Sequence, residues 1–307
     1  MTIQKLPFLA LTCFLGALAS AQGSPPRCLN TLAYYNPTLR TGCFNATWFI
    51  LRVPKTAVQS IVPSDYPLIT PPESLFPNGF PADSHPVVVN CGYMNDIRQG
   101  PLQIQALMGA GINVPYVDRL RDGKTPFNYP CRTFIGGVNG KDISAVVPAL
   151  VGSTQGNSIL VASFSPNDGP YAALASSPNE FEAQVRQVIL PNPISGPGIV
   201  PAAFDLDFTS ASPAQYAEDT FRALINQPTI LTNTKCQRNT YYFNQTFRES
   251  VMRTGDATLY GPARMGAVPA ELDNRYVEQG GYSASSVMVG FNAEDCASAG
   301  ANVDPNA

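Results

Sequence analysis

TWFILRVP, residues 47–54, is the stretch of sequence that decides the fold. β-Branched and aromatic side chains dominate it, and such residues favour the extended backbone of a strand. The strand ends at Pro54, because proline has no backbone N–H to donate to a neighbouring strand. We therefore predict a strand over residues 47–53, followed by a short helical turn over residues 57–61.

Apolar runs of strand length recur along the rest of the chain. VVVNCGYM (87–94), SILVASF (158–164) and SVMVGF (286–291) are mostly apolar, as expected of strands that are covered on both faces. LQIQAL (102–107) alternates between apolar and polar residues over its first five positions. That period is typical of a strand whose two faces meet different surroundings.

Helices are predicted at only two further places. Residues 178–189 offer Asn179 as a cap, and a second helix begins with Ser212 as the cap and Pro213 in its first position. No repeat, charge block or long linker divides the chain. We predict an α+β fold, mainly antiparallel β, in which residues 22–307 form a single domain.

The composition excludes several classes of protein. The 307 residues carry 19 Lys and Arg against 22 Asp and Glu, a net charge of −3, with only five lysines. Nucleic-acid binders need a basic face that neutralises phosphates, so we expect no nucleic-acid partner. A hydrophobic fraction of 44% is enough to bury a large core. Because His85 is the only histidine, we expect neither a metal nor a cofactor.

The first 21 residues have the pattern of a secretory signal peptide. MTIQKLPFLALTCFLGALASA has one basic residue, Lys5, an apolar run over residues 6–18, and small residues up to Ala21. A buried N-terminal helix is the alternative. The run is too short for a membrane anchor, and no later run of 18 apolar residues occurs, so we expect no membrane partner. We predict a protein that is secreted or resides in the lumen of the secretory pathway.

Six cysteines follow the predicted signal peptide. An even number in a secreted chain implies up to three disulfides, and six cysteines allow 15 pairings. A metal site or a catalytic thiol is the alternative, but no CxxC spacing occurs. The cysteines are Cys28, Cys43, Cys91, Cys131, Cys236 and Cys296.

Two acceptor sequons for N-glycosylation agree with this compartment. They begin at Asn45 and Asn244, each with a threonine two positions later. A third candidate, Asn36, is excluded because Pro37 follows it. We therefore predict a glycoprotein.

Three segments, in the right order, resemble the acetoacetate decarboxylase-like superfamily. The first is the strand and short helix of residues 48–63, and the second joins residues 87–96 to residues 102–107. The third contains LYGPARM (259–265) and VEQGGYS (277–283) with the strand after it. The resemblance implies a curved antiparallel β-barrel that encloses a mostly apolar cavity. We predict ligand-binding roles in that cavity for Trp48, Tyr93, Met94, Tyr260 and Met265; for Tyr93 and Met94 the packed core is the alternative.

The chemistry of that family transfers less well than its fold. Its decarboxylases form a Schiff base through a lysine of lowered pKa, and the resemblance places Lys141 nearest to that position. Asp142 follows it, and a carboxylate raises the pKa of a neighbouring amine, which leaves little free amine to react. The family's essential carboxylate aligns with Asn90, a candidate catalytic residue that is either a polar contact in the cavity or a satisfied buried amide. The family's basic residue before the first strand aligns near Phe44 or Asn45. These departures argue against decarboxylation.

Four further candidate catalytic residues have competing interpretations. Lys141 is either a reactive amine or part of an exposed turn, NGKD (139–142). Gln103 and Gln105 share one face of an alternating strand, so they either donate hydrogen bonds to a ligand carbonyl or face solvent. Arg264 either binds an anionic oxygen or closes a surface ion pair.

Two groups of polar residues outside these motifs add weaker candidates. His85 lies in PADSHP (81–86) near Asp83, where the sequence favours a solvated loop over a catalytic dyad. Asp205 and Asp207 share one face of a strand. They are either an acid–base pair, or calcium ligands, or solvated residues at a strand edge.

Together the residues and the resemblance favour a cofactor-independent enzyme that holds an apolar small molecule without a Schiff base. Its length, signal peptide and disulfides resemble those of accessory enzymes of fungal secondary metabolism. A cyclisation, above all a hetero-Diels–Alder cycloaddition, suits a pocket of neutral donors, because positioning alone supplies about 7–11 kcal/mol. The alternatives are a Schiff-base decarboxylase or aldolase acting on a keto acid through Lys141, and a non-catalytic extracellular carrier. A homo-oligomer is a further expectation.

Overall fold

The computed structural model describes residues 28–191, 198–243 and 249–307 of the chain. The predicted signal peptide, residues 1–21, and the predicted acceptor Asn244 lie outside the described residues. Within the described ranges, no helix is both long enough and apolar enough to cross a membrane.

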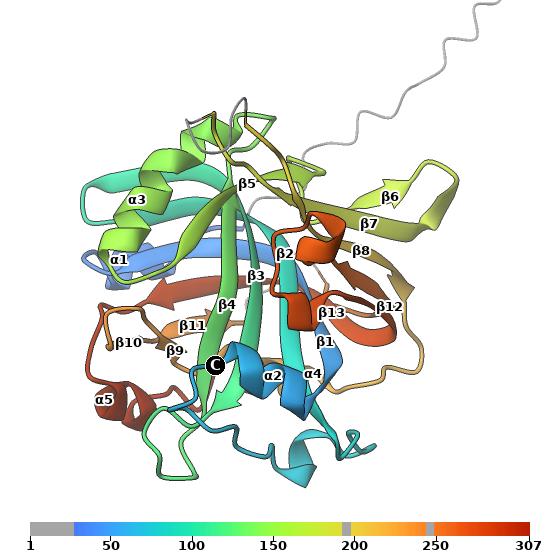
Figure 1. Ribbon diagram of the computed structural model, residues 1–307. Helices are drawn as coiled ribbons and strands as arrows, with labels where there is room; N and C mark the ends of the chain where they lie inside the picture. Colours follow the sequence, from blue (N-terminus) through green and yellow to red (C-terminus); the bar gives the residue numbers. More distant parts are fainter. Residues whose placement is uncertain (1–27, 192–197, 244–248) are drawn as a thin grey trace, which may run out of the picture.

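Nine strands of the 13-stranded sheet close into a barrel (Figure 1). Around it the order is β4-β3-β2-β1-β13-β12-β8-β7-β5, and β5 returns to β4. These neighbours are antiparallel except β4 and β5, whose parallel pairing closes the ring. The bounds are β1 Arg40–Pro54, β2 Ser84–Gln99, β3 Leu102–Val117, β4 Phe127–Gly136, β5 Ile159–Ser165, β7 Ser177–Gln187, β8 Ala202–Ser210, β12 Val251–Leu259 and β13 Asn274–Gly290.

The other elements are short and surround this barrel. The strands are β6 Ala172–Leu174, β9 Thr229–Ile230, β10 Cys236–Gln237 and β11 Asn239–Tyr242. The α-helices are α1 Leu32–Tyr35, α2 Lys55–Ile61, α3 Val146–Thr154, α4 Glu218–Ile225 and α5 Cys296–Ala301; the 3-10 turns are η1 Glu73–Leu75, η2 Asp142–Ala145, η3 Pro262–Arg264 and η4 Ala270–Leu272. The predicted α+β fold, mainly antiparallel with few short helices, is confirmed.

The long strands bound two spaces, because side chains alternate between the faces of a sheet. On one face of β1, Phe49, Leu51 and Val53 join a packed core to which all nine barrel strands contribute. Residues of opposite strands meet only inside a barrel, so this core fills its interior. On the other face, Phe44 and Trp48 look into a second space.

A second ring of strands surrounds that other space. It shares β4, β3, β2, β1 and β13 with the barrel. At one end β11 pairs with the last four residues of β13, and at the other β9 pairs with β4 and with β10. β10 runs into β11 through a single residue, Arg238, which completes the ring. Aromatic side chains fill part of it; for example, the rings of Trp48 and Phe243 lie 5.3 Å apart.

The structure corrects both helices predicted from cap signals. The helix over residues 178–189 is wrong: that segment is β7, in which Ala183 and Val185 are buried with the period of a strand. β7 pairs with both β5 and β8, and this tertiary pairing overrides a local cap. The second helix exists, but it begins at Glu218 rather than near Ser212.

Two of the three expected disulfides are present. Cys28 bonds to Cys43, and Cys236 bonds to Cys296. The prediction for Cys91 and Cys131 is wrong, because both are buried free thiols. They lie on β2 and β4, with β3 between them, so their Cα atoms are about 10 Å apart or more, beyond the reach of a disulfide. Burial raises the pKa of Cys91 to about 12, which keeps this thiol protonated.

Candidate functional site

A cavity of ≈780 Å³ occupies the second ring of strands. Its volume falls within the range of sites that bind small organic molecules. β1, β2, β3 and β4 provide its floor, and α3, β11 and the end of β13 contribute to its walls. The resemblance implied a cavity enclosed by the curved barrel. The interior of the nine-stranded barrel is packed instead, and the cavity lies beside it, in the second ring of strands.

The strand register lines up one row of residues across the cavity floor. Trp48 of β1 is opposite Asn90 of β2, Asn90 is opposite Gly111 of β3, and Gly111 is opposite Thr133 of β4. Residues directly opposite each other point to the same face of a sheet. All four line the cavity, so the apolar run that predicted β2 also delivers an amide to the site.

Two glycines of β3 keep this floor hollow. A Cβ on Gly111 would lie 3.0 Å from Asn90 Oδ1 and 3.0 Å from Asn113 Nδ2. A Cβ on Gly109 would lie 3.0 Å from Met94 Cε. Because neither residue has a side chain, the two amides and the methionine can lie over the strand.

Three asparagines, Asn90, Asn113 and Asn128, form what we call the asparagine recess of the cavity. The side chains of Asn90 and Asn113 make no hydrogen bond to another described residue. Asn128 is 5% exposed; its Nδ2 donates to Leu224 O at 2.9 Å, while its Oδ1 has no partner among the described residues. An unpaired buried polar group costs about 1–3 kcal/mol. The amides of Asn90 and Asn113, which can both donate and accept hydrogen bonds, are the groups of the recess that a ligand can meet.

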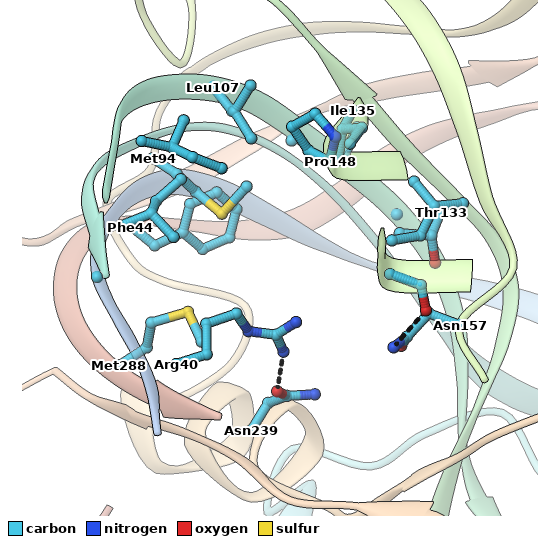
Figure 2. Close-up of a pocket in the computed structure, with 18 of the residues that line it drawn as sticks. Arg40, Phe44, Met94, Leu107, Thr133, Ile135, Pro148, Asn157, Asn239 and Met288 are labelled. Atoms are coloured by element: carbon cyan, nitrogen blue, oxygen red, sulfur yellow. Dashed lines mark hydrogen bonds between the residues drawn. The ribbon is translucent and has the colours of Figure 1, made fainter. Parts of the chain in front are cut away.

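Apolar side chains surround the middle of the cavity. Phe44, Met94 and Leu107 gather on one side of the open space, with Met288 below them (Figure 2). Pro148 of α3 also lines the cavity. Methionine side chains are flexible and adapt to irregular shapes, so this part can close around different apolar groups.

Arginines are the only charged side chains among the described lining residues, which contain no lysine, histidine, aspartate or glutamate. Arg98 is neutralised by Asp96, with 2.7 Å between Nε and Oδ1. Arg40 has no such partner in the described part of the chain: its Nη2 donates to Asn239 Oδ1 at 2.7 Å (Figure 2).

No described lining group is set to gain or lose a proton near neutral pH. Burial raises the pKa of Tyr241 above its ordinary value, although the charge of Arg40 opposes this. Burial lowers the pKa of Arg40, and Tyr241 opposes that shift. A guanidinium remains charged in proteins and Tyr241 remains a neutral phenol, so neither is a general base. Among the described residues, no group of three His, Cys, Asp or Glu is placed to hold a metal ion.

Five of the predicted site residues do line the cavity. Asn90, Trp48 and Met94 lie within it, and Gln103 and Gln105 lie at its rim, where both are exposed. Gln103 Nε2 donates to Asp96 Oδ1 at 2.9 Å.

The remaining predicted site residues do not line the cavity. Tyr93 packs against the core on the other face of β2. Lys141 is exposed and closes a turn in which Asn139 and Gly140 have φ values of 55° and 71°. The turn interpretation therefore applies, and the placement of a reactive amine in the site is wrong.

The segment after β12 also lies away from the cavity. Arg264 pairs with Asp273, which supports its ion-pair interpretation, and Met265 is 84% exposed. Tyr260 donates its hydroxyl to Asp205 Oδ2 at 2.6 Å. The predicted ligand-binding roles of Tyr260 and Met265 are thus corrected: strand pairing places this loop behind the packed core.

Two weaker sequence interpretations are overturned as well. His85 is fully buried in β2, with 2.7 Å between its Nε2 and Pro115 O, rather than solvated in a loop. Asp205 lies on β8, which has β7 and β12 on either side, so it is not at a sheet edge. Arg186 neutralises it at 2.5 Å.

Asn45, one predicted glycosylation acceptor, is half-buried in the middle of β1, between β2 and β13. An acceptor normally lies on an exposed loop, so this position is a less accessible one. Its glycosylation stays a prediction.

Sequence reasoning missed Arg40, Asn113, Asn128 and Asn239, which all line the cavity. The polar residue at position 113 of an otherwise apolar strand was one available signal. The others become recognisable only once the strands are paired.

Comparisons with known proteins give likenesses of fold. No protein-family model matches the sequence, and a search of curated proteins finds no significant match. One similar solved structure is the enduracididine biosynthesis enzyme MppR complexed with the condensation product of pyruvate and imidazole 4-carboxaldehyde (TM-score 0.49, 10% identity, 83% of this chain and 88% of that chain). Another is an acetoacetate decarboxylase-like enzyme from Sphingomonas wittichii RW1 (TM-score 0.44, 9% identity, 84% of this chain and 93% of that chain).

Proposed function

We propose that the cavity binds a mainly apolar small molecule and promotes its cyclisation, with a hetero-Diels–Alder cycloaddition as the specific reaction. The observation that carries this proposal is the lining itself, which combines apolar side chains with neutral amides and contains no described lysine, histidine or carboxylate. Among its described residues such a site offers no general base, and so no group that would activate the hydroxyl of Ser144 or of a lining threonine as a nucleophile. A pericyclic reaction needs neither.

The size of the cavity supplies what such a reaction does need. Two reacting groups that are held about 3–3.5 Å apart and aligned avoid much of the entropic cost of meeting, and this effect is worth up to about 7–11 kcal/mol. A cavity of ≈780 Å³ can hold a folded substrate with both groups inside.

The asparagine recess adds an electrostatic contribution. An amide N–H directed at a carbonyl oxygen stabilises the charge that develops there during an asymmetric cycloaddition. Asn90 and Asn113 are suited to this because their amides have no other described partner. In this proposal the protein is an accessory enzyme of secondary metabolism; the signal-peptide pattern and the two disulfides support passage through the secretory pathway.

The test is a comparison of catalysed and spontaneous reactions. A linear precursor with a heterodiene and an alkene on one apolar chain is incubated with and without protein, and products are quantified by chromatography. We expect an acceleration of at least about 100-fold, equivalent to about 3 kcal/mol, and a changed product ratio. Lys141→Ala is the control and leaves the rate unchanged, because Lys141 is exposed and does not line the cavity.

Two outcomes would replace this proposal. Binding of the precursor with an unchanged product ratio would make the protein a carrier. A covalent adduct on Lys141 after borohydride reduction, located by peptide mass mapping, would make it a Schiff-base enzyme.

A further inference from the structure

The pairing of three strands, β1, β13 and β11, sets the position of Arg40. Gly290 of β13 is opposite Arg40 of β1 on one side and opposite Asn239 of β11 on the other. A Cβ on Gly290 would lie 2.9 Å from both Nε and Nη2 of Arg40 and 3.0 Å from Asn239 Oδ1. The guanidinium and the amide therefore lie side by side over a residue that has no side chain.

The charge of Arg40 is not compensated by the described residues. Its one hydrogen bond to a described side chain goes to Asn239 Oδ1, a neutral acceptor. A guanidinium carries five N–H donors, so most of them have no side-chain acceptor in the described part of the chain. A positive charge that is partly withdrawn from water is unfavourable unless an anion pairs with it.

The surroundings of Arg40 divide into an apolar side and a polar side. Arg40 lines the main cavity, where Phe44 and Met288 are neighbours along the same face. It also lines a second cavity of ≈190 Å³. Amide and hydroxyl groups dominate that lining, and no described acidic residue is part of it: Gln99, Thr154, Gln155, Asn233, Gln237 and Asn292.

We propose that Arg40 binds the carboxylate of a ligand whose apolar body extends into the main cavity. Two parallel N–H···O bonds from a guanidinium match the two oxygens of a carboxylate. Tyr241 lines the same cavity, and its hydroxyl has no other described partner, so it offers a further donor. The substrate class is thus an apolar organic acid. The inference rests on the proposed function only in requiring that the cavity is occupied by a small molecule.

Isothermal titration calorimetry with matched acids and esters tests this assignment. The probes are dodecanoic acid with methyl dodecanoate, and 1-naphthaleneacetic acid with its methyl ester, so that a chain and a ring are both represented. For at least one pair, we expect the acid to bind the wild-type protein roughly 10- to 100-fold more tightly than its ester, the range for a hydrogen bond to a charged group. Arg40→Gln removes this preference, because glutamine keeps a donor for Asn239 but not the charge.

Arg98→Gln is the matched control, since Arg98 lines the same cavity but is already neutralised by Asp96. It keeps the preference for the acid. Gly290→Ala is a second variant: it crowds the guanidinium without removing its charge, and it lowers affinity for the acid more than for the ester. Thermal melting curves confirm that each variant is folded.

The possible failures are distinguishable. Equal affinity for acid and ester, or a preference that survives Arg40→Gln in a folded protein, overturns the role of Arg40 and leaves the proposed function intact. If neither member of either pair binds, occupation of the cavity by an apolar molecule is itself contradicted, and the carboxylate site fails with it.

Discussion

At the scale of single residues, the site depends on what glycine leaves out. Gly111 has no side chain, and Asn90 Oδ1 and Asn113 Nδ2 each lie 3.0 Å from the position that a Cβ atom would take. Both amides line the cavity and have no other described partner, so their position over Gly111 decides which groups of a ligand they can meet.

Gly111→Ala should therefore reduce the cyclisation rate by roughly tenfold, the effect of weakening one hydrogen bond by about 1.4 kcal/mol. Gly109→Ala is the matched control: it crowds only Met94 Cε, which is flexible, and should change the rate less than about threefold. Steady-state kinetics compares the two variants. Ligand titration can follow Trp48, the only tryptophan of the chain, which lines the cavity and is 2% exposed.

Equal losses in both alanine variants would mean that the floor is sensitive to any added methyl group. In that case the asparagine recess would have no special part in the reaction. The unfolding free energy of both variants is measured in parallel, because alanine restricts the unfolded chain more than glycine does and is expected to change stability by no more than about 1 kcal/mol.

Sequence reasoning reached some of these residues and missed others for a common physical reason. Asn90 was recognisable because it interrupts an apolar strand that resembles a known motif. Asn128 and Arg40 carry no local signal: each joins the cavity because β4 or β1 pairs with strands far away in the sequence. His85 was misplaced because its polar neighbours indicated a loop, whereas β2 already begins at Ser84.

At the scale of elements, three short strands, β9, β10 and β11, close the second ring. β10 has only two residues, and the disulfide between Cys236 and Cys296 ties it to α5. Cys236 also exchanges backbone hydrogen bonds with Glu294 at 2.9 Å. β11, which carries Asn239 and Tyr241 into the cavity wall, follows directly.

Replacing Cys236 and Cys296 with serine should lower the unfolding free energy by about 4 kcal/mol, because this disulfide closes a loop of 60 residues. The disulfide between Cys28 and Cys43 closes only 15 residues, so the same change there should cost about 3 kcal/mol. Urea denaturation without reductant measures both. We further expect the first variant, but not the second, to lose affinity for cavity ligands, since β10 leads into β11. A reversed order in ligand affinity would contradict this role of β10 in holding the cavity wall.

The predicted runs fall on five of the nine barrel strands, β1, β2, β3, β5 and β13, while the two helices show where prediction stopped. An apolar run of strand length indicates a strand where both of its faces are covered, as in the first half of β2. In β7 only Ala183 and Val185 are fully buried, so the pattern was weak and a cap signal misled. β7 is a strand because it pairs with β5 and β8, and its own sequence does not show this pairing.

At the scale of the whole molecule, one buried group links folding to pH. His85 is fully buried, its Nδ1 has no described hydrogen-bond partner, and its Nε2 contacts Pro115 O. Burial, reinforced by the charge of Lys55, lowers the pKa of His85 to about 4, from 6.5 for an exposed histidine. The folded state therefore prefers the neutral ring.

The unfolded chain takes up this proton near pH 6.5 and the folded chain only near pH 4, so stability is complete above pH 6.5 and falls as the pH drops towards 4. The total loss is on the order of 3 kcal/mol. His85→Gln, which keeps a donor for Pro115 O, should flatten this dependence. Chemical denaturation at several pH values provides the measurement, and the difference between the two proteins isolates His85 because it is the only histidine.

An identical slope in His85→Gln would assign the acid sensitivity to carboxylates instead. Asp207 acts in the opposite sense, because burial and the neighbouring Asp205 raise its pKa and the folded state then holds the proton more tightly. Its contribution is common to both proteins and cancels in their difference.

The alternation of β1 and β2 between packed core and cavity has a consequence for altering selectivity in the laboratory. Positions 44, 46 and 48 and positions 88, 90 and 94 face the side of the cavity, whereas Phe49, Val87, Val89 and Cys91 belong to the packed core of the barrel. A mutant library restricted to every second codon of these two segments would reshape the pocket and spare that packed core. Positions that set the selectivity of the pocket and positions that hold the fold therefore alternate along each of these two segments.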